Sequence, residues 1–220
     1  MSFPQRIAIA SRNAHKLLEF GRICAGWPVE WLTVESHDGP WPDVEETGDT
    51  YLENALLKAH AVADALGVPA LADDSGIEVD ALGGRPGPRS ARFSGPDATD
   101  ERNLQALMQA VAGVPAGGRS ARYRCLAAIA WPGGEALHAE GVCEGVLVAK
   151  RRGQRGFGYD PIFVPAGWEN TMAELSEEQK DRISHRGRAF RSLHDLVTSA
   201  GYPTQGSGVD RRRIFGGPNE

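Results

Sequence analysis

Cysteine is scarce in this sequence, and its scarcity excludes two kinds of site. There are 3 cysteines among 220 residues (Cys24, Cys125 and Cys143), and no two of them form a CxxC pair. An odd, scattered set argues against a disulfide framework and against a zinc site, and it fits a reducing compartment.

Long apolar runs and excess positive charge are missing as well. No stretch approaches the roughly 20 apolar residues of a membrane span, and the apolar core of the N-terminal segment, Ile7 to Ala10, is too short for a signal peptide. We therefore expect a cytoplasmic protein with no membrane partner. A net charge of −5 argues against general affinity for nucleic acid. If the ligand is an anion, the protein must gather local positive charge or use a metal.

What is present is the composition of an ordinary globular protein, with 41% hydrophobic and 24% charged residues. Apolar spacing predicts helices at 13–24, 50–66, 103–112 and 185–200, and strands at 6–10, up to Asp73-Asp74, near 77–79, at 119–131 and at 135–148. The last two strands meet at Pro132-Gly133-Gly134, which favours a hairpin. This order predicts an α/β domain with a mixed sheet over residues 1–200. Residues 201–220 lack periodicity and are predicted to form a flexible tail.

The segment SRNAHK, residues 11–16, follows the first predicted strand directly. Unpaired backbone N–H groups and the dipole at a helix N-terminus attract anions, and Lys16 can swing back toward them as a point charge. The glycines of a Walker loop are absent. A simple helix cap followed by a surface lysine has the same sequence. Both interpretations stay open at this point.

Acidic side chains form a second candidate set: Glu45, Glu46, Asp73 and Asp74. Magnesium prefers one or two protein carboxylates, with water and phosphate oxygens completing its octahedron. Because neighbouring side chains of a strand point to opposite faces, Asp73 and Asp74 need not share one role, and the one facing the cleft should do the chemistry. A turn after a strand and a solvated acidic loop are the alternatives.

Three further groups could recognise a nucleotide. Cations are available at Lys58, Arg89, Arg92, Lys180 and Arg186, although each singly is more often a surface residue. In GFGYD, residues 156–160, two glycines flank Phe157, whose ring can stack on a base or simply pack in the core. In SHRGRA, residues 184–189, Ser184 can cap the last helix and so place Arg186 in its first turn, where a cation is unfavourable with the dipole. This placement favours another purpose for Arg186.

Taken together and in order, these segments are far more specific than any one alone. SRNAHKLLEF, EETGDTYLENALLKAHA, LADDSGIEVDALGGRPGPRSARFSG, GFGYDPIF and SHRGRA resemble the inosine triphosphatase family, the Ham1/RdgB-like non-standard purine NTP pyrophosphatases. The resemblance runs from about Ile7 to Ala200. It implies an elongated, two-lobed α/β fold with the cleft between the lobes, and a homodimer. It also implies magnesium-dependent hydrolysis of ITP, XTP and their deoxy forms to monophosphate and pyrophosphate, which cleanses the nucleotide pool.

The same resemblance implies roles for matched positions. Asp74 is expected to be the general base and a magnesium ligand, with Glu45 or Glu46 completing the metal site, and Ser75 is expected to contact substrate. Lys58 and Lys180 would add positive charge at the phosphates, and His185 and Arg186 would lie near the edge of the base. The triphosphate would lie along Ser11, Arg12, Asn13, Ala14, His15 and Lys16, and the base against Phe157, Gly158, Tyr159 and Asp160. Ser11-Arg12 departs from the Thr-Gly of many members, which leaves the role of Arg12 open.

Two other functions compete with this one. A Maf-like pyrophosphatase acting on pyrimidine nucleotides shares the general fold, but its motif set is not found here. A nucleotide-binding module without turnover would need a cation cradle without a catalytic carboxylate and metal pair, whereas this chain has several acids in candidate positions.

Overall fold

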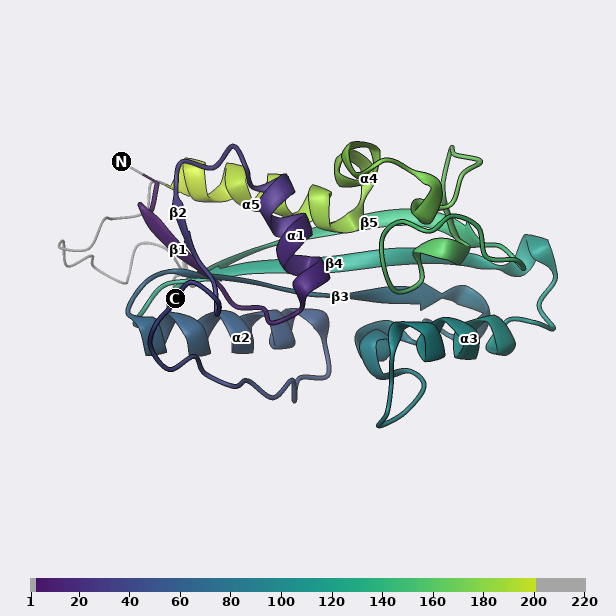
Figure 1. Ribbon diagram of the computed structural model, residues 1–220, viewed down its shortest axis with the longest axis horizontal. Coiled ribbons are helices and arrows are strands. Elements are labelled where there is room, and N and C mark those ends of the chain that lie inside the picture. Colours follow the sequence, from purple (N-terminus) through teal and green to yellow (C-terminus); the bar gives the residue numbers. More distant parts are fainter. Residues whose placement is uncertain (1–2, 201–220) are drawn as a thin grey trace, which may run out of the picture.

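The computed structural model describes residues 3–200, so the predicted tail at 201–220 lies outside the described residues. Its centre is a six-stranded sheet in the order β2-β1-β3-β4-β5-β6 (Figure 1). The strands are β1 (Arg6–Ile9), β2 (Glu30–Leu32), β3 (Ala70–Val79), β4 (Ser120–Ala130), β5 (Ala136–Leu147) and β6 (Phe163–Pro165). β2, β1 and β3 are parallel, whereas β3 to β6 run antiparallel. The predicted mixed sheet is confirmed.

Helices cover both faces of this sheet (Figure 1). The helices are α1 (Ala14–Ile23), α2 (Tyr51–Leu66), α3 (Asp100–Ala110), α4 (Glu177–Ile183) and α5 (His185–Ala200). α1, α4 and α5 lie on one side, and α2 and α3 lie on the other. Capping contacts explain where α1 and α2 begin: the Asn13 side chain accepts from the Lys16 N–H, and Thr50 forms a capping box with Glu53. None of the helices in residues 3–200 is long and apolar enough to cross a membrane.

One strand prediction was wrong. Asp73 and Asp74 do not end a strand; they lie in the middle of β3, which runs without a break for 10 residues. Antiparallel pairing with β4 continues along its whole length, from Ala70 opposite Ala130 to Val79 opposite Ala121. The ladder to a long neighbouring strand therefore outweighs the local turn preference of Asp, Ser and Gly. β2 and β6, with 3 residues each, were not predicted.

Hydrophobic side chains gather at both ends of the long strands, which gives the fold its two lobes. One lobe packs α1 and α5 against β1 and β4, with Phe20, Ile129 and Phe190 at its centre. On the opposite face of the sheet, alanines of α2 pack closely on alanines of β3 and β4. The other lobe packs α3 and the turn before β6 around Ile77 and Leu107.

The sheet opens between the lobes, at the point where β1 turns away. β1 pairs with β3 only at Ala70 and Leu71, and the chain then enters α1. β3 continues for eight residues beyond that point, carrying Asp73 to Gly76 past the end of β1. A crevice beyond the carboxyl end of a parallel strand, beside a helix N-terminus, is a common place for a ligand.

Two glycines let other segments approach this crevice closely. A Cβ on Gly141 of β5 would collide with the backbone of His185 and Ala189, so the glycine lets the first turn of α5 lie directly on the sheet. A Cβ on Gly76 would collide with Gly87 and Ser90 of the 3₁₀ helix η2 (Gly87–Arg92). Both contacts hold their segments at the wall of the crevice.

Candidate active site

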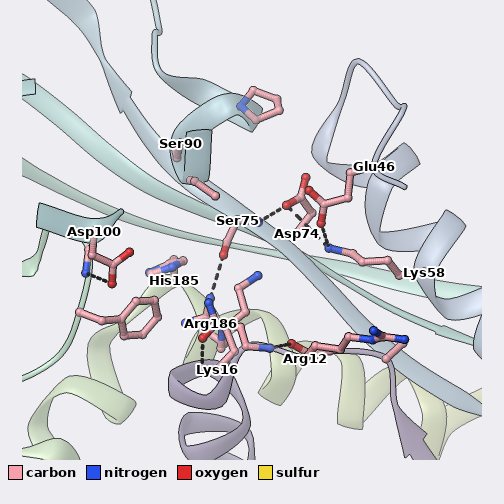
Figure 2. Close-up of a pocket in the computed structure, with 18 of the residues that line it drawn as sticks. Arg12, Lys16, Glu46, Lys58, Asp74, Ser75, Ser90, Asp100, His185 and Arg186 are labelled. Atoms are coloured by element: carbon pink, nitrogen blue, oxygen red, sulfur yellow. Dashed lines mark hydrogen bonds and ion pairs between the residues drawn. The ribbon is translucent and has the colours of Figure 1, made fainter. Parts of the chain in front are cut away.

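A cavity of about 330 Å³ lies at this opening in the sheet. Its wall is built from the turn between β1 and α1, the 41–46 loop, α2, β3, η2, the 157–160 turn, α4 and the start of α5. Figure 2 shows Glu46, Lys58 and Asp74 at one end, and His185 and Asp100 at the other, with Ser75 between them. Polar side chains from segments far apart in the sequence therefore converge on one space.

Asp73 and Asp74 face opposite sides of β3. Asp73 is 2% exposed and contacts Lys16 of α1 and Arg186 of α5, with Lys16 Nζ 3.1 Å from Oδ1 and Arg186 Nη2 3.0 Å from Oδ2. Asp74 faces α2, where its Oδ2 accepts from Asn54 Nδ2 at 3.1 Å. Of the two, only Asp74 lines the cavity. The strand geometry thus separates a structural carboxylate from an accessible one.

Asp74, Glu46 and Lys58 form a compact charged group. Lys58 Nζ lies 2.6 Å from Glu46 Oε1 and 3.9 Å from Asp74 Oδ1, so one ammonium serves both carboxylates (Figure 2). Burial raises the pKa of Asp74 more than Lys58 and Lys16 lower it. Burial alone would raise the pKa of Glu46 as well, but the attraction of Lys58 is stronger, so the pKa of Glu46 is lowered. The pKa of Asp74 thus lies above the ordinary value for an aspartate, and that of Glu46 lies below the ordinary value for a glutamate.

Glu45 does not share this position. It is exposed and does not line the cavity, whereas Glu46 is partly buried and does. The sequence left the choice between the two open. In the structure Glu46 is the residue beside Asp74, because Lys58 and Arg92 both hold it there: Arg92 Nη2 lies 3.3 Å from the Glu46 carbonyl oxygen.

A network of ion-paired side chains, most of them buried, forms part of the cavity wall and continues behind it. Its six members alternate in sign and come from α1, β3, α4, α5 and the 157–160 turn: Lys16, Asp73, Arg186, Glu19, Lys180 and Asp160. Glu19 of α1 bridges Arg186 and Lys180, and these cations outweigh the effect of burial and lower its pKa to about 2. Each buried charge therefore has a partner, as a low-dielectric interior requires.

Most of the N–H donors of Arg186 are already used within this network of ion pairs. Its guanidinium makes four hydrogen bonds, two to Asp73 and one each to Glu19 and Ser75. Since arginine carries five N–H donors, one remains for a ligand. The unfavourable position in the first turn of α5 is thus compensated by two carboxylates, and the predicted Ser184 cap is confirmed by its bond from Gly187 N.

The ring of Phe157 marks the other end of the cavity. His15 of α1 stacks on it, with ring centroids 5.3 Å apart and planes at 17°, and Lys180 Nζ lies 4.9 Å from the ring centroid. Lys180 was expected at the phosphates. It lies beside Phe157, where Asp160 and Glu19 hold its ammonium. Asp160 also accepts from the Phe157 N–H at 2.9 Å and so fixes the turn.

His185 presents an unsatisfied nitrogen at this end. Its ring is 5% exposed and stacks on Tyr123, with centroids 4.6 Å apart and planes at 7°. Burial, then the neighbouring Arg186, lower its pKa well below 6.5, so the imidazole is neutral at pH 7. Nδ1 has no hydrogen-bond partner among the described residues, and the side chain lines the cavity. Protein atoms cover this nitrogen, so a polar ligand atom reaches it only when the ring or a neighbouring side chain shifts.

Most of the residues singled out in the sequence meet here. Those that line the cavity are Ser11, Arg12, Asn13, Lys16, Glu46, Lys58, Asp74, Ser75, Phe157, Gly158, Tyr159, Asp160, Lys180, His185 and Arg186. Those that do not are Ala14, His15, Glu45, Asp73, Arg89 and Arg92. Sequence reasoning missed Glu19 and Asn54, which hold functional candidates in place. Glu19 follows Lys16 by one helical turn, a spacing that could have pointed to it.

The sequence profile of the Ham1 family matches residues 7–196. The chain belongs to this family. It is 49% identical over 199 residues to a protein of Cutibacterium acnes named dITP/XTP pyrophosphatase, covering 88% of this chain and 97% of the relative.

Solved structures agree with this assignment. A HAM1 protein from Coxiella burnetii is 38% identical with a TM-score of 0.79, covering 88% of this chain and 98% of that one. A nucleoside-triphosphatase, also named dITP/XTP pyrophosphatase, from Mycobacterium abscessus is 41% identical with a TM-score of 0.69, covering 86% and 98%. The predicted family and its two-lobed fold are confirmed.

Proposed function

We propose that this protein hydrolyses non-standard purine nucleoside triphosphates, ITP and XTP and their deoxy forms, to the monophosphate and pyrophosphate. One observation carries the proposal. A single cavity joins two carboxylates and a shared lysine, at one end, to an aromatic ring and a neutral imidazole with an unpaired Nδ1 at the other. The first end suits phosphate chemistry and the second suits a base. The names of the Ham1 relatives are in keeping with it.

Magnesium fits the carboxylate end. No group of three or more histidine, cysteine, aspartate or glutamate side chains in residues 3–200 is arranged to hold a metal ion by itself, but Asp74 and Glu46 supply two hard oxygen donors beside one cavity. That number suits Mg²⁺, which leaves most of its coordination to water and substrate phosphate. Asp74 and Glu46 would hold the ion and together balance its charge, which would leave the positive charge of Lys58 available to the triphosphate. Bound there, the ion would polarise the phosphate oxygens.

The reaction at this end is an in-line attack of water on the α-phosphorus. Asp74 accepts the proton of the attacking water, a role that its raised pKa favours. Lys16, together with the N–H groups at the start of α1, stabilises the charge that develops on the leaving pyrophosphate. Lys58 stays close to both carboxylates and limits their mutual repulsion.

The aromatic end distinguishes purine bases by their 6-position. Lys180 donates to Glu19 and Asp160 and Arg186 makes four bonds, so each cation retains one N–H donor. Together they form a donor edge that favours the 6-oxo acceptor of hypoxanthine and xanthine, and His185 Nδ1 adds to it in the tautomer that carries the ring proton on Nδ1. The 6-amino group of adenine would meet donors there and stay unpaired, at a cost of about 1–3 kcal/mol.

A panel of nucleoside triphosphates assayed with magnesium tests the proposal, with pyrophosphate and orthophosphate resolved. We expect pyrophosphate and monophosphate from ITP and XTP, and roughly 10- to 100-fold lower kcat/KM with ATP. Preference for a pyrimidine triphosphate would favour the Maf-like alternative. Tight binding without turnover would favour a binding module.

We also propose the homodimer and the cytoplasmic location that the resemblance implies. Light scattering of the purified protein tests the first, and fractionation of the source cells tests the second.

A further inference from the structure

The side chain of Arg12 crosses from the start of α1 to the loop between β2 and α2. Its Nη2 lies 3.2 Å from the Trp41 carbonyl oxygen and 3.4 Å from that of Pro42. Nη1 lies 3.8 Å from Asp43, whose side chain is 91% exposed. An exposed ion pair of this length contributes little, so the contact depends on the two backbone carbonyls.

The segment that Arg12 holds has few other polar anchors, and at the same point the Trp41 side chain packs against the alanine cluster of α2, β3 and β4. Residues 33–50 contain no helix or strand. Near the cavity, Lys58 and Arg92 hold Glu46 through its carboxylate and carbonyl oxygens. Arg12 holds the same segment a few residues earlier, at Trp41 and Pro42. The 41–46 segment thus forms a wall of the cavity that is fixed at both ends.

We propose that Arg12 is a positioning residue that fixes the 41–46 segment and so sets Glu46 beside Asp74 for a divalent cation. This inference rests on the proposed function only in assigning the cation to that pair. Both carbonyl oxygens accept from Nη2, the far end of the long arginine side chain, and the shorter side chain of lysine would not carry its ammonium to the same point. Because the carbonyl acceptors do not titrate, the contact is retained throughout the neutral and acid pH range.

Arg12→Ala and Arg12→Lys test the inference, with Arg6→Ala as the matched control. Arg6 is equally exposed, at 51% against 54%, and its loss removes the same charge from the same region, but its partner is Glu30, and it does not line the cavity. The first readout is binding of Mn²⁺ to the protein with a non-hydrolysable ITP analogue, followed by electron paramagnetic resonance. The second is hydrogen exchange of the amides of residues 41–46. The third is the rate as a function of magnesium and of ITP.

We expect Arg12→Ala to weaken Mn²⁺ binding by about 3- to 10-fold, the scale of one or two lost hydrogen bonds. Exchange in residues 41–46 should accelerate, and the magnesium concentration that gives the half-maximal rate should rise in step with the weakened Mn²⁺ binding. Arg12→Lys should recover little of the lost affinity, and Arg6→Ala should match the parent protein.

Two results would overturn the inference. Unchanged Mn²⁺ binding with unchanged exchange would show that Arg12 fixes nothing. A raised KM for ITP at saturating magnesium, with normal Mn²⁺ binding, would make Arg12 a direct phosphate contact instead. If the parent protein did not hydrolyse ITP, the proposed function would fail, but Mn²⁺ binding and exchange would still decide the role of Arg12.

Discussion

Asp73 and Asp74 are neighbours in sequence, yet they belong to different environments because β3 turns them to opposite faces. Asp73 lies between Lys16 and Arg186, and Asp74 lies beside Asn54 and Lys58. Their pKa values move in opposite directions. The cations outweigh the burial of Asp73 and lower its pKa, whereas burial dominates at Asp74 and raises it. One carboxylate therefore stabilises the fold and the other is available to act on substrate.

Asp74→Asn should lower turnover by about 10²-fold or more, the scale of general-base catalysis. Nucleotide affinity should change far less, since the shape of the site is kept. The free energy of unfolding at pH 7 should stay the same or rise, because the substitution removes a carboxylate that burial disfavours in its charged form. Steady-state kinetics and urea denaturation measure both effects. A fully active Asp74→Asn protein would mean that another group takes the proton.

Asp73→Asn should instead lower the free energy of unfolding. It leaves Lys16 and Arg186 short of a buried partner, so the free energy of unfolding should fall by about 3 kcal/mol or more. The folded-state pKa of Asp73 lies below its ordinary 3.8, so its stabilising contribution is complete above that value and is lost as pH falls through the folded-state pKa. The stability gap between parent and variant should therefore be constant from pH 5 to 7 and narrow below about pH 4. A gap that widens on acidification would contradict this assignment.

His185→Phe tests base recognition. The phenyl ring can keep the stack on Tyr123 but removes Nδ1. We expect the ITP/ATP ratio of kcat/KM to fall by about 10-fold, mainly through loss of activity on ITP. Thermal stability should be maintained, because the lost nitrogen has no partner among the described residues. An unchanged ratio in a stable variant would show that the base is read elsewhere.

Arg186→Ala is a poorer test of specificity. It would leave Asp73 and Glu19 without a shared buried cation, so loss of folding would accompany any change in substrate preference.

Gly141→Ala should disturb the site although Gly141 itself does not line the cavity. The added Cβ collides with the backbone of His185 and Ala189 and pushes the first turn of α5 off the sheet. We expect a loss of about 1–3 kcal/mol in stability and reduced activity on ITP. Gly21→Ala is the matched control, because Gly21 lies in α1 with nothing within 4 Å of an added Cβ. It should leave activity unchanged and stabilise slightly. Equal effects of the two substitutions would mean that the close approach at Gly141 is unimportant.

The sequence predicted the elements whose signals are local. The helix at 50–66 has its capping box and a final glycine, Gly67, in the left-handed region, and the long hairpin has its Gly-Gly turn. The continuity of β3 was not predictable in this way. Asp, Ser and Gly locally indicate a turn, and only pairing with β4 keeps them extended. Two 3-residue strands were likewise too short for a periodic pattern.

The positions of site residues were predictable where a sequence motif contains them. They were less predictable where contacts with residues distant in sequence set them. Asp74 and Lys16 were expected in the cavity and lie there. Lys180 was expected with the phosphates, and Glu19 and Asp160, distant in sequence, hold it near Phe157. The choice between Glu45 and Glu46 also depends on tertiary contacts, here from Lys58 and Arg92.

In the proposed mechanism, water attacks the α-phosphorus of a purine triphosphate while Asp74 accepts its proton. Turnover of ITP in ¹⁸O-labelled water, with both products analysed by mass spectrometry, tests it most directly. We predict one ¹⁸O atom in the inosine monophosphate and none in the pyrophosphate. Label in pyrophosphate, or release of orthophosphate with a diphosphate, would contradict the account.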